Sequence, residues 1–232
     1  MDRNETRPAS RCALCREKRK LERSHIIPQF VFRWAKGRSG NSGLPDGPSQ
    51  PMLCRDCEDL FGVNESEFAR EVFHPFAARL LLSANYGSWL RKFSASVCWR
   101  ILESRPVDDP SGSLSGRWSQ ELASCRETWR LYLTGKRPDV GAHHLHLMPW
   151  NGVEDATDAR LHAIGMSVNF TDDAAFVCAK LGPILLAGLI ADPVPGLWRG
   201  TRINAEGKLK RCDRVVPDYF HAIVLRRATS WG

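Results

Sequence analysis

The sequence predicts an α+β protein in which a small zinc-stabilised module, residues 1–75, is followed by a mixed helical and β region, residues 76–232. Three observations support this fold class. Cysteines occur as two CxxC pairs, Cys12 with Cys15 and Cys54 with Cys57, inside the first 75 residues. From residue 76 onward, apolar residues recur at three- and four-residue steps, which is typical of buried helices. Short apolar segments with the lengths of β-strands then follow between residues 145 and 190.

The composition is that of a globular protein and carries no signal for export or membrane insertion. Hydrophobic residues make up 43% of the chain and charged residues 25%. The longest apolar run, residues 181–191, is broken by glycine and proline, and the polar N-terminus lacks the apolar core of a signal peptide. We therefore expect a cytoplasmic protein, whose cysteines stay reduced and whose cysteine pairs bind metal rather than form disulfides.

The two CxxC pairs supply four thiolates to one tetrahedral zinc ion, although 38 residues separate Cys15 from Cys54. Four protein ligands leave no open position on the metal, so the expected zinc is structural. It holds a small hairpin against a short helix, and without the metal these two elements have too small a hydrophobic core to fold alone. The other cysteines are isolated, and they are Cys98, Cys125, Cys178 and Cys212.

Local signals divide the module into short elements. The expected order is a zinc knuckle, a small hairpin, a helix and a loop rich in Gly, Ser and Pro, at residues 11–16, 17–23, 29–36 and 37–51. The second knuckle begins a further helix, where acidic side chains complement the helix dipole. We expect Gly62 to end this helix and Asn64 to cap the next one, over residues 65–73.

The second region is expected to begin with helices and continue with strands. The helices are placed at residues 76–82, 89–102 and 118–133, with a linker at residues 104–116. The strands are placed at residues 145–150, 164–169, 175–179 and 184–190. A hairpin over residues 200–210 and a closing helix over residues 217–229 complete the chain.

Three segments, CALC, SHIIP and LCRDCE, follow one another between residues 11 and 70. In this order they resemble the zinc-stabilised, four-cysteine branch of the HNH (ββα-metal) endonucleases, whose module is treble-clef-like. The resemblance implies that His25 is the general base and that Ser24 and Glu58 occupy the two positions that ligate a catalytic Mg²⁺ or Mn²⁺. This chain departs from the family there, since Ser24 replaces an acidic residue or histidine and Glu58 replaces asparagine or histidine.

Each of these side chains also has a simpler interpretation. His25 can be a buried or zinc-supporting histidine, and Glu58 can be an acid that complements the helix dipole. The basic charge is concentrated nearby, because residues 1–50 contain 11 Lys and Arg against 5 Asp and Glu, whereas the rest contains 22 against 21. Such a patch favours a nucleic-acid partner, although a solubilising basic terminus fits the charge equally well.

Two functions follow from these observations. The first is a metal-dependent HNH-like endonuclease that hydrolyses phosphodiester bonds, with DNA as the expected substrate and restriction or phage defence as the setting. The alternative is a catalytically decayed zinc protein of the same fold that binds nucleic acid or a protein partner. In either case residues 76–232 would select substrate, form a homo-oligomer or dock a protein partner, and no membrane is involved.

Overall fold

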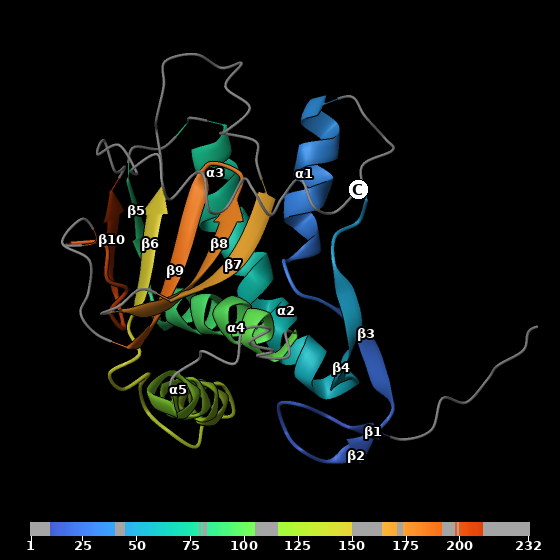
Figure 1. Cartoon of the computed structure of the whole chain (residues 1–232). Coiled ribbons are helices and arrows are strands. Elements are labelled where there is room, and N and C mark those ends of the chain that lie inside the picture. Colours follow the sequence, from blue (N-terminus) through green and yellow to red (C-terminus); the bar gives the residue numbers. More distant parts are fainter. Residues whose placement is uncertain are drawn as a thin grey trace, which may run out of the picture.

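The computed structural model describes residues 10–39, 45–78, 80, 83–104, 116–149, 164–170, 174–191, 198 and 200–210. In this part of the chain the fold is α+β, with helices packed against small antiparallel sheets (Figure 1). No helix in the described ranges combines the length and apolar character that crossing a bilayer requires. The isolated Cys212 and the helix expected at residues 217–229 lie outside the described residues.

The first part of the chain alternates short strands with helices. Its elements are β1 (Ser10–Arg11), β2 (Lys18–Arg19), β3 (Leu21–His25), α1 (Gln29–Ser39), β4 (Ser49–Cys54), α2 (Arg55–Phe68), η1 (Ala69–Phe73) and α3 (His74–Ala77). Strand β1 pairs with β2, and β3 pairs with β4, both antiparallel. The second pairing sets His25 opposite Ser49 and Leu21 opposite Cys54. The CxxC turn, the hairpin and the following helix thus form one continuous unit.

Helix α2 does not end at Gly62, which corrects the sequence expectation. It continues to Phe68, then as one π-helical turn and the short α3 to Ala77. Glycine costs a helix about 1 kcal/mol relative to alanine, but here Phe61 and Phe68 are buried on either side of it. Tertiary packing therefore outweighs the local penalty. Asn64 is no cap, and its amide donates to the Leu60 carbonyl inside the helix.

The second part contains β5 (Ser83–Tyr86), α4 (Ser88–Ser104), α5 (Gly116–Leu133), β6 (Leu145–Pro149), β7 (Ile164–Phe170), β8 (Ala175–Leu181), β9 (Ile184–Ala191) and β10 (Gly207–Lys210). Four of these strands form an antiparallel sheet in the order β6-β9-β8-β7. The helix expected at residues 76–82 extends only to Ala77, because the described residues 78 and 80 are not helical, and β5 begins at Ser83. The hairpin expected at residues 200–210 is also wrong, because β10 pairs with β5, far back in the chain.

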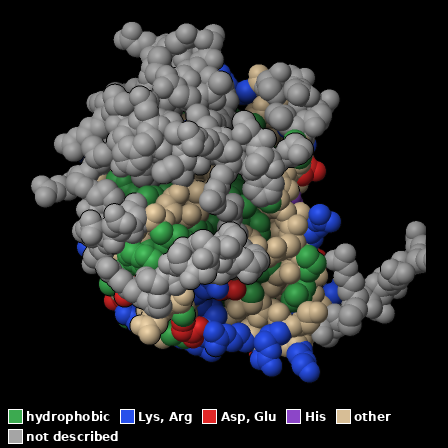
Figure 2. Space-filling model, in the orientation of Figure 1, with side chains coloured by type: hydrophobic (Ala, Val, Ile, Leu, Met, Phe, Trp, Pro, Cys, Tyr) green, Lys and Arg blue, Asp and Glu red, His purple; other side chains and the backbone are tan. Residues whose placement is uncertain are grey.

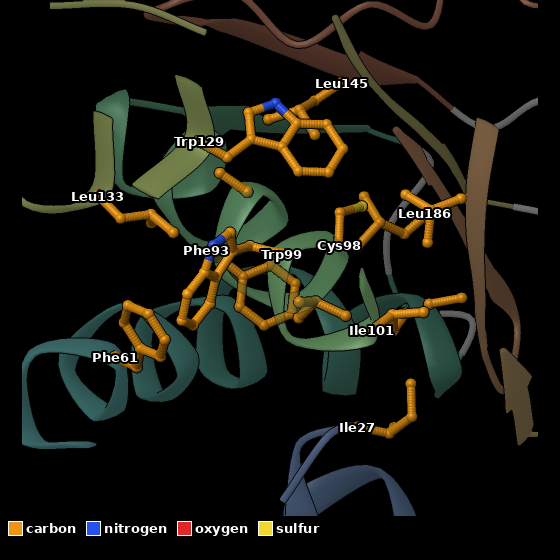
Figure 3. Packing of buried hydrophobic residues seen from close by; sticks show 14 of the residues in the cluster. Ile27, Phe61, Phe93, Cys98, Trp99, Ile101, Trp129, Leu133, Leu145 and Leu186 are labelled. Atoms are coloured by element: carbon orange, nitrogen blue, oxygen red, sulfur yellow. The ribbon is translucent and has the colours of Figure 1, made fainter. Parts of the chain in front are cut away.

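Helix α4 lies at the centre of the described core. It runs along the sheet with α2 and α5 packed beside it (Figure 1). Phe93, Trp99 and Ile101 on different faces of α4 are all buried, which is typical of a helix enclosed on every side. Figure 3 shows this helix meeting Phe61 of α2, Trp129 of α5 and Leu186 of β9. The regions expected as residues 1–75 and 76–232 therefore share one continuous core.

A close contact in this core gives a stability test. A Cβ on Gly188 would stand 2.6 Å from the Trp129 ring and 3.0 Å from the Cys98 sulfur. We expect Gly188→Ala to lower the free energy of unfolding by about 1–3 kcal/mol through overpacking. The control is Gly62→Ala, where a Cβ meets nothing within 4 Å, and a gain of about 0.5–1 kcal/mol is expected. Urea unfolding measures both, and equal effects would contradict this packing.

The buried His146 gives a pH test. It is 2% exposed in β6, and burial, assisted by nearby His144 and Arg202, lowers its pKa to about 4. The unfolded chain takes up this proton at about pH 6.5, so stability is lost as the pH falls from there toward about 4. We expect the free energy of unfolding to fall by up to about 1.4 kcal/mol per pH unit from this group. His146→Gln should flatten the slope, and an unchanged slope would count against the assignment.

Candidate metal centre and catalytic site

The structure brings the four cysteines of the two CxxC pairs together. The Sγ atoms of Cys12, Cys15, Cys54 and Cys57 all lie within 4.8 Å of one another, and those of Cys15 and Cys54 are 3.9 Å apart. Tetrahedral zinc with Zn–S bonds of about 2.3 Å requires sulfurs roughly 3.8 Å apart. The donor set, its spacing and its burial therefore fit a structural zinc ion. Among the described residues, this is the one such cluster of three or more Cys, His, Asp or Glu ligands.

Backbone geometry aims the four thiols at one point. The first pair lies in the turn between β1 and β2, where the Cys12 carbonyl accepts from the Arg16 amide and Arg16 has a φ of 66°. The second pair begins where β4 passes into α2. Two contacts join the turns, since the Cys54 amide donates to the Cys12 sulfur and the Ala13 amide donates to the Met52 carbonyl.

The thiols differ in acidity. Burial raises the pKa of Cys12, but hydrogen bonds from the backbone of Cys54, Cys15 and Leu14 outweigh it, so the net pKa lies below the ordinary value. Burial raises the pKa of Cys15 and of Cys57, and the neighbouring sulfurs raise both further. A divalent cation held by these four sulfurs would offset that repulsion and favour the thiolate form of each group.

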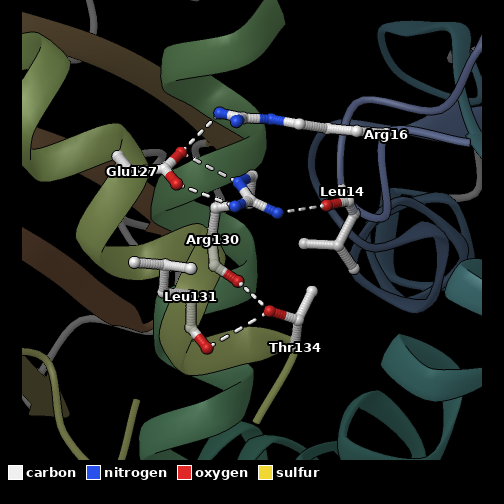
Figure 4. A network of polar contacts seen from close by, with 6 residues as sticks. All are labelled: Leu14, Arg16, Glu127, Arg130, Leu131 and Thr134. Carbon is white, nitrogen blue, oxygen red and sulfur yellow. Dashed lines mark hydrogen bonds and ion pairs between the residues drawn. The ribbon is translucent and has the colours of Figure 1, made fainter. Parts of the chain in front are cut away.

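Helix α5 supports the first zinc knuckle from outside. The buried Arg130 donates from Nη1 to the Leu14 carbonyl, 3.0 Å away, and from Nη2 to the Glu127 carboxylate, 2.7 Å away. Glu127 also pairs with Arg16 of the knuckle (Figure 4). One ion-pair network therefore fixes the loop between the first two ligands to a helix more than 100 residues later.

The two neighbours in the SHIIP segment lie differently. His25 is the last residue of β3 and is half-buried. Ser24 is fully buried, and its hydroxyl accepts from the Leu53 amide at 3.2 Å. Adjacent strand residues point to opposite sides, so the Ser24 hydroxyl does not share a side with the His25 imidazole. Its described contact braces β3 against β4.

Glu58 lies in the first turns of α2 and is half-buried, with its Oε1 atom enclosed and without a hydrogen-bond partner. Phe61 and Glu65 follow at i+3 and i+7, so all three side chains share one helix face. Phe61 and Glu65 both contact Arg100 of α4. The carboxylate of Glu58 therefore lies on the face of α2 that is turned toward α4.

Two residues near His25, Arg100 and Asp46, were not singled out from the sequence as site residues. Arg100 donates to the His25 carbonyl at 2.7 Å and pairs with Glu65. Asp46 has a lowered pKa, chiefly from its hydrogen bond and charge pairing with Lys36, and His25 contributes to the same shift. The sequence signal that could have identified Arg100 is its position as a charged residue inside the apolar run of residues 97–102. The loop that carries Asp46 contains no comparable signal.

The zinc assignment gives a direct test. We expect Cys54→Ser to lose the bound zinc and to unfold the hairpin that depends on it, because three thiolates no longer close the tetrahedron. The control is Cys98→Ala, which removes a buried thiol from α4 and should lower stability while zinc content stays at one per chain. Elemental analysis and thermal melting measure these outcomes. Full zinc content in Cys54→Ser would disprove the four-cysteine site.

Comparison with known proteins adds no family to this geometry: no family model, no curated protein and no solved structure matches the chain.

Proposed function

We propose that this protein is a metal-dependent, HNH-like endonuclease that hydrolyses phosphodiester bonds in DNA. The observation that carries the proposal is the enclosed, unpartnered Glu58 oxygen on α2, in the helix that begins at the zinc ligands and packs beside the His25 strand. A buried carboxylate oxygen without a partner is costly, so it favours a bound cation. The zinc frame supports this arrangement by joining the hairpin to the helix.

In the proposed reaction His25 acts as the general base. Its imidazole would take a proton from the water that attacks the phosphorus. Glu58 would hold one Mg²⁺ or Mn²⁺, and such an ion would supply positive charge to stabilise the transition state of phosphodiester hydrolysis. Such ions need few carboxylates, since water and phosphate complete their coordination. Ser24 contributes by keeping β3 and β4 in register.

Exposed basic side chains support a nucleic-acid partner. Arg23 lies two residues before His25 on β3, hence on the same side of the strand, and is exposed with its Nε bonded to Ser49. Lys18 in β2 and Lys20 after it are also exposed, and Figure 2 shows Lys and Arg gathered at the end of the molecule that carries β1 and β2. These cations suit a phosphate backbone that passes across the His25 hairpin.

A decayed HNH-fold zinc protein that binds nucleic acid or a protein partner is the second candidate. The observation that favours it is the Ser24 hydroxyl, which is committed to the Leu53 amide where the family places a cation ligand. Both candidates suit the cytoplasm, where the four thiols stay reduced, and a restriction or phage-defence role is proposed by analogy with HNH modules.

Cleavage of plasmid DNA separates the two candidates. We expect the wild-type protein with Mg²⁺ or Mn²⁺ to nick or cut plasmid, and His25→Ala to be slower by about 100-fold or more, because general-base catalysis contributes that much. Glu58→Gln should raise the Mn²⁺ concentration required for half-maximal cutting. The control is Asp59→Asn, since Asp59 is exposed and pairs with Arg55 on the outer side of α2. Identical cutting by wild type and His25→Ala would leave only the binding function.

A further inference from the structure

We propose that Arg100 of α4 is a positioning residue for this site, one that fixes the His25 strand end against the Glu58 face of α2. The inference rests on the proposed function and extends it to a residue outside the HNH-like motif. It also gives part of the second region a defined role, because α4 then completes the site instead of forming a separate docking surface.

Each nitrogen of the Arg100 guanidinium has a described partner. Its side chain is 2% exposed, Nε donates to the Ser96 carbonyl at 3.3 Å, and Nη1 donates to the His25 carbonyl at 2.7 Å. Nη2 pairs with the Glu65 carboxylate, and the guanidinium carbon stands 5.5 Å from the Phe61 ring centre. One rigid planar fork therefore holds its own helix, the end of β3 and helix α2 at once.

Helical spacing connects this contact to Glu58. Glu65 follows Glu58 by seven residues, which is two turns or about 10.5 Å along the same face of α2. Holding Glu65 and Phe61 therefore sets the rotation of the helix and with it the direction of the Glu58 carboxylate. Holding the His25 carbonyl fixes the backbone from which the His25 imidazole projects. Arg100 thus controls the relation between the proposed base and the proposed ligand without touching the substrate.

A purely structural ion pair would make a different prediction. Buried ion pairs are expensive to desolvate, and well-packed apolar residues of similar size often replace them without loss of stability. If Arg100 and Glu65 only fill the core, then the double variant Arg100→Met with Glu65→Leu should fold and cut normally. If Arg100 positions the site, the same variant should fold, keep its zinc and remain slow, because no group holds the His25 carbonyl.

The experiment measures plasmid cleavage by the full chain with Mn²⁺, together with zinc content and melting temperature. For the double variant we expect one zinc per chain and a kcat about 10- to 100-fold below wild type, with KM for the plasmid little changed, as a small misplacement of reacting groups costs that much. Arg100→Lys is the second variant, since an ammonium pairs with Glu65 but lacks the fork that reaches the His25 carbonyl as well. It should show the same loss of kcat.

Arg91→Met is the matched control. Arg91 belongs to the same helix, donates to the Tyr132 hydroxyl and lies 5.3 Å from the centre of that ring, with no contact to the hairpin among the described interactions. It should retain the wild-type kcat. A zinc-loaded double variant or Arg100→Lys with the wild-type kcat would overturn the positioning role. If His25→Ala itself cuts like wild type, the proposed function fails and the positioning role fails with it.

Discussion

The four-thiol cluster is the constraint on which the first part of the structure depends. Strands β1 and β2 contribute two residues each to their pairing, and β3 pairs with β4 across a register irregularity. Pairings of this length are marginal in water, so the energy that holds them comes from elsewhere. The thiols of Cys12, Cys15, Cys54 and Cys57 meet at the junction of the first turn, β4 and α2, where a bound zinc ion would supply it.

Two buried arginines attach this four-cysteine unit to the helical core. Arg130 of α5 donates to the carbonyl of Leu14, which lies between Cys12 and Cys15, and Arg100 of α4 donates to the carbonyl of His25, the last residue of β3. Each also pairs with a glutamate, so neither charge is left uncompensated. A backbone carbonyl remains when the side chain of its residue is substituted, so a hydrogen bond to it fixes the path of the chain whatever that side chain is. The hairpin is thereby held at both ends by helices of the second region.

The sequence predicted the features that follow from local residue patterns, but it did not predict contacts between residues far apart in the chain. The cysteine spacing identified the cluster, and apolar periodicity placed the helices near residues 89–102 and 118–133. Gly62 was misread because a local penalty was weighed without the burial of Phe61 and Phe68. The contact of the Ser24 hydroxyl with the Leu53 amide could not be predicted from the motif, because it depends on the pairing of β3 with β4. Arg100 was visible as a charge in an apolar run, but its partner lies 75 residues earlier.

The pairing of β5 with β10 sets the order in which the chain can be completed during synthesis. Ser83–Tyr86 finds its partner only when Gly207–Lys210 has left the ribosome, whereas the four cysteines are all available by residue 57. The four-cysteine unit can therefore form early, while the edge of β5 waits for more than 100 further residues. Exposed strand edges invite pairing with other chains, so the nascent polypeptide carries an aggregation-prone edge during this interval.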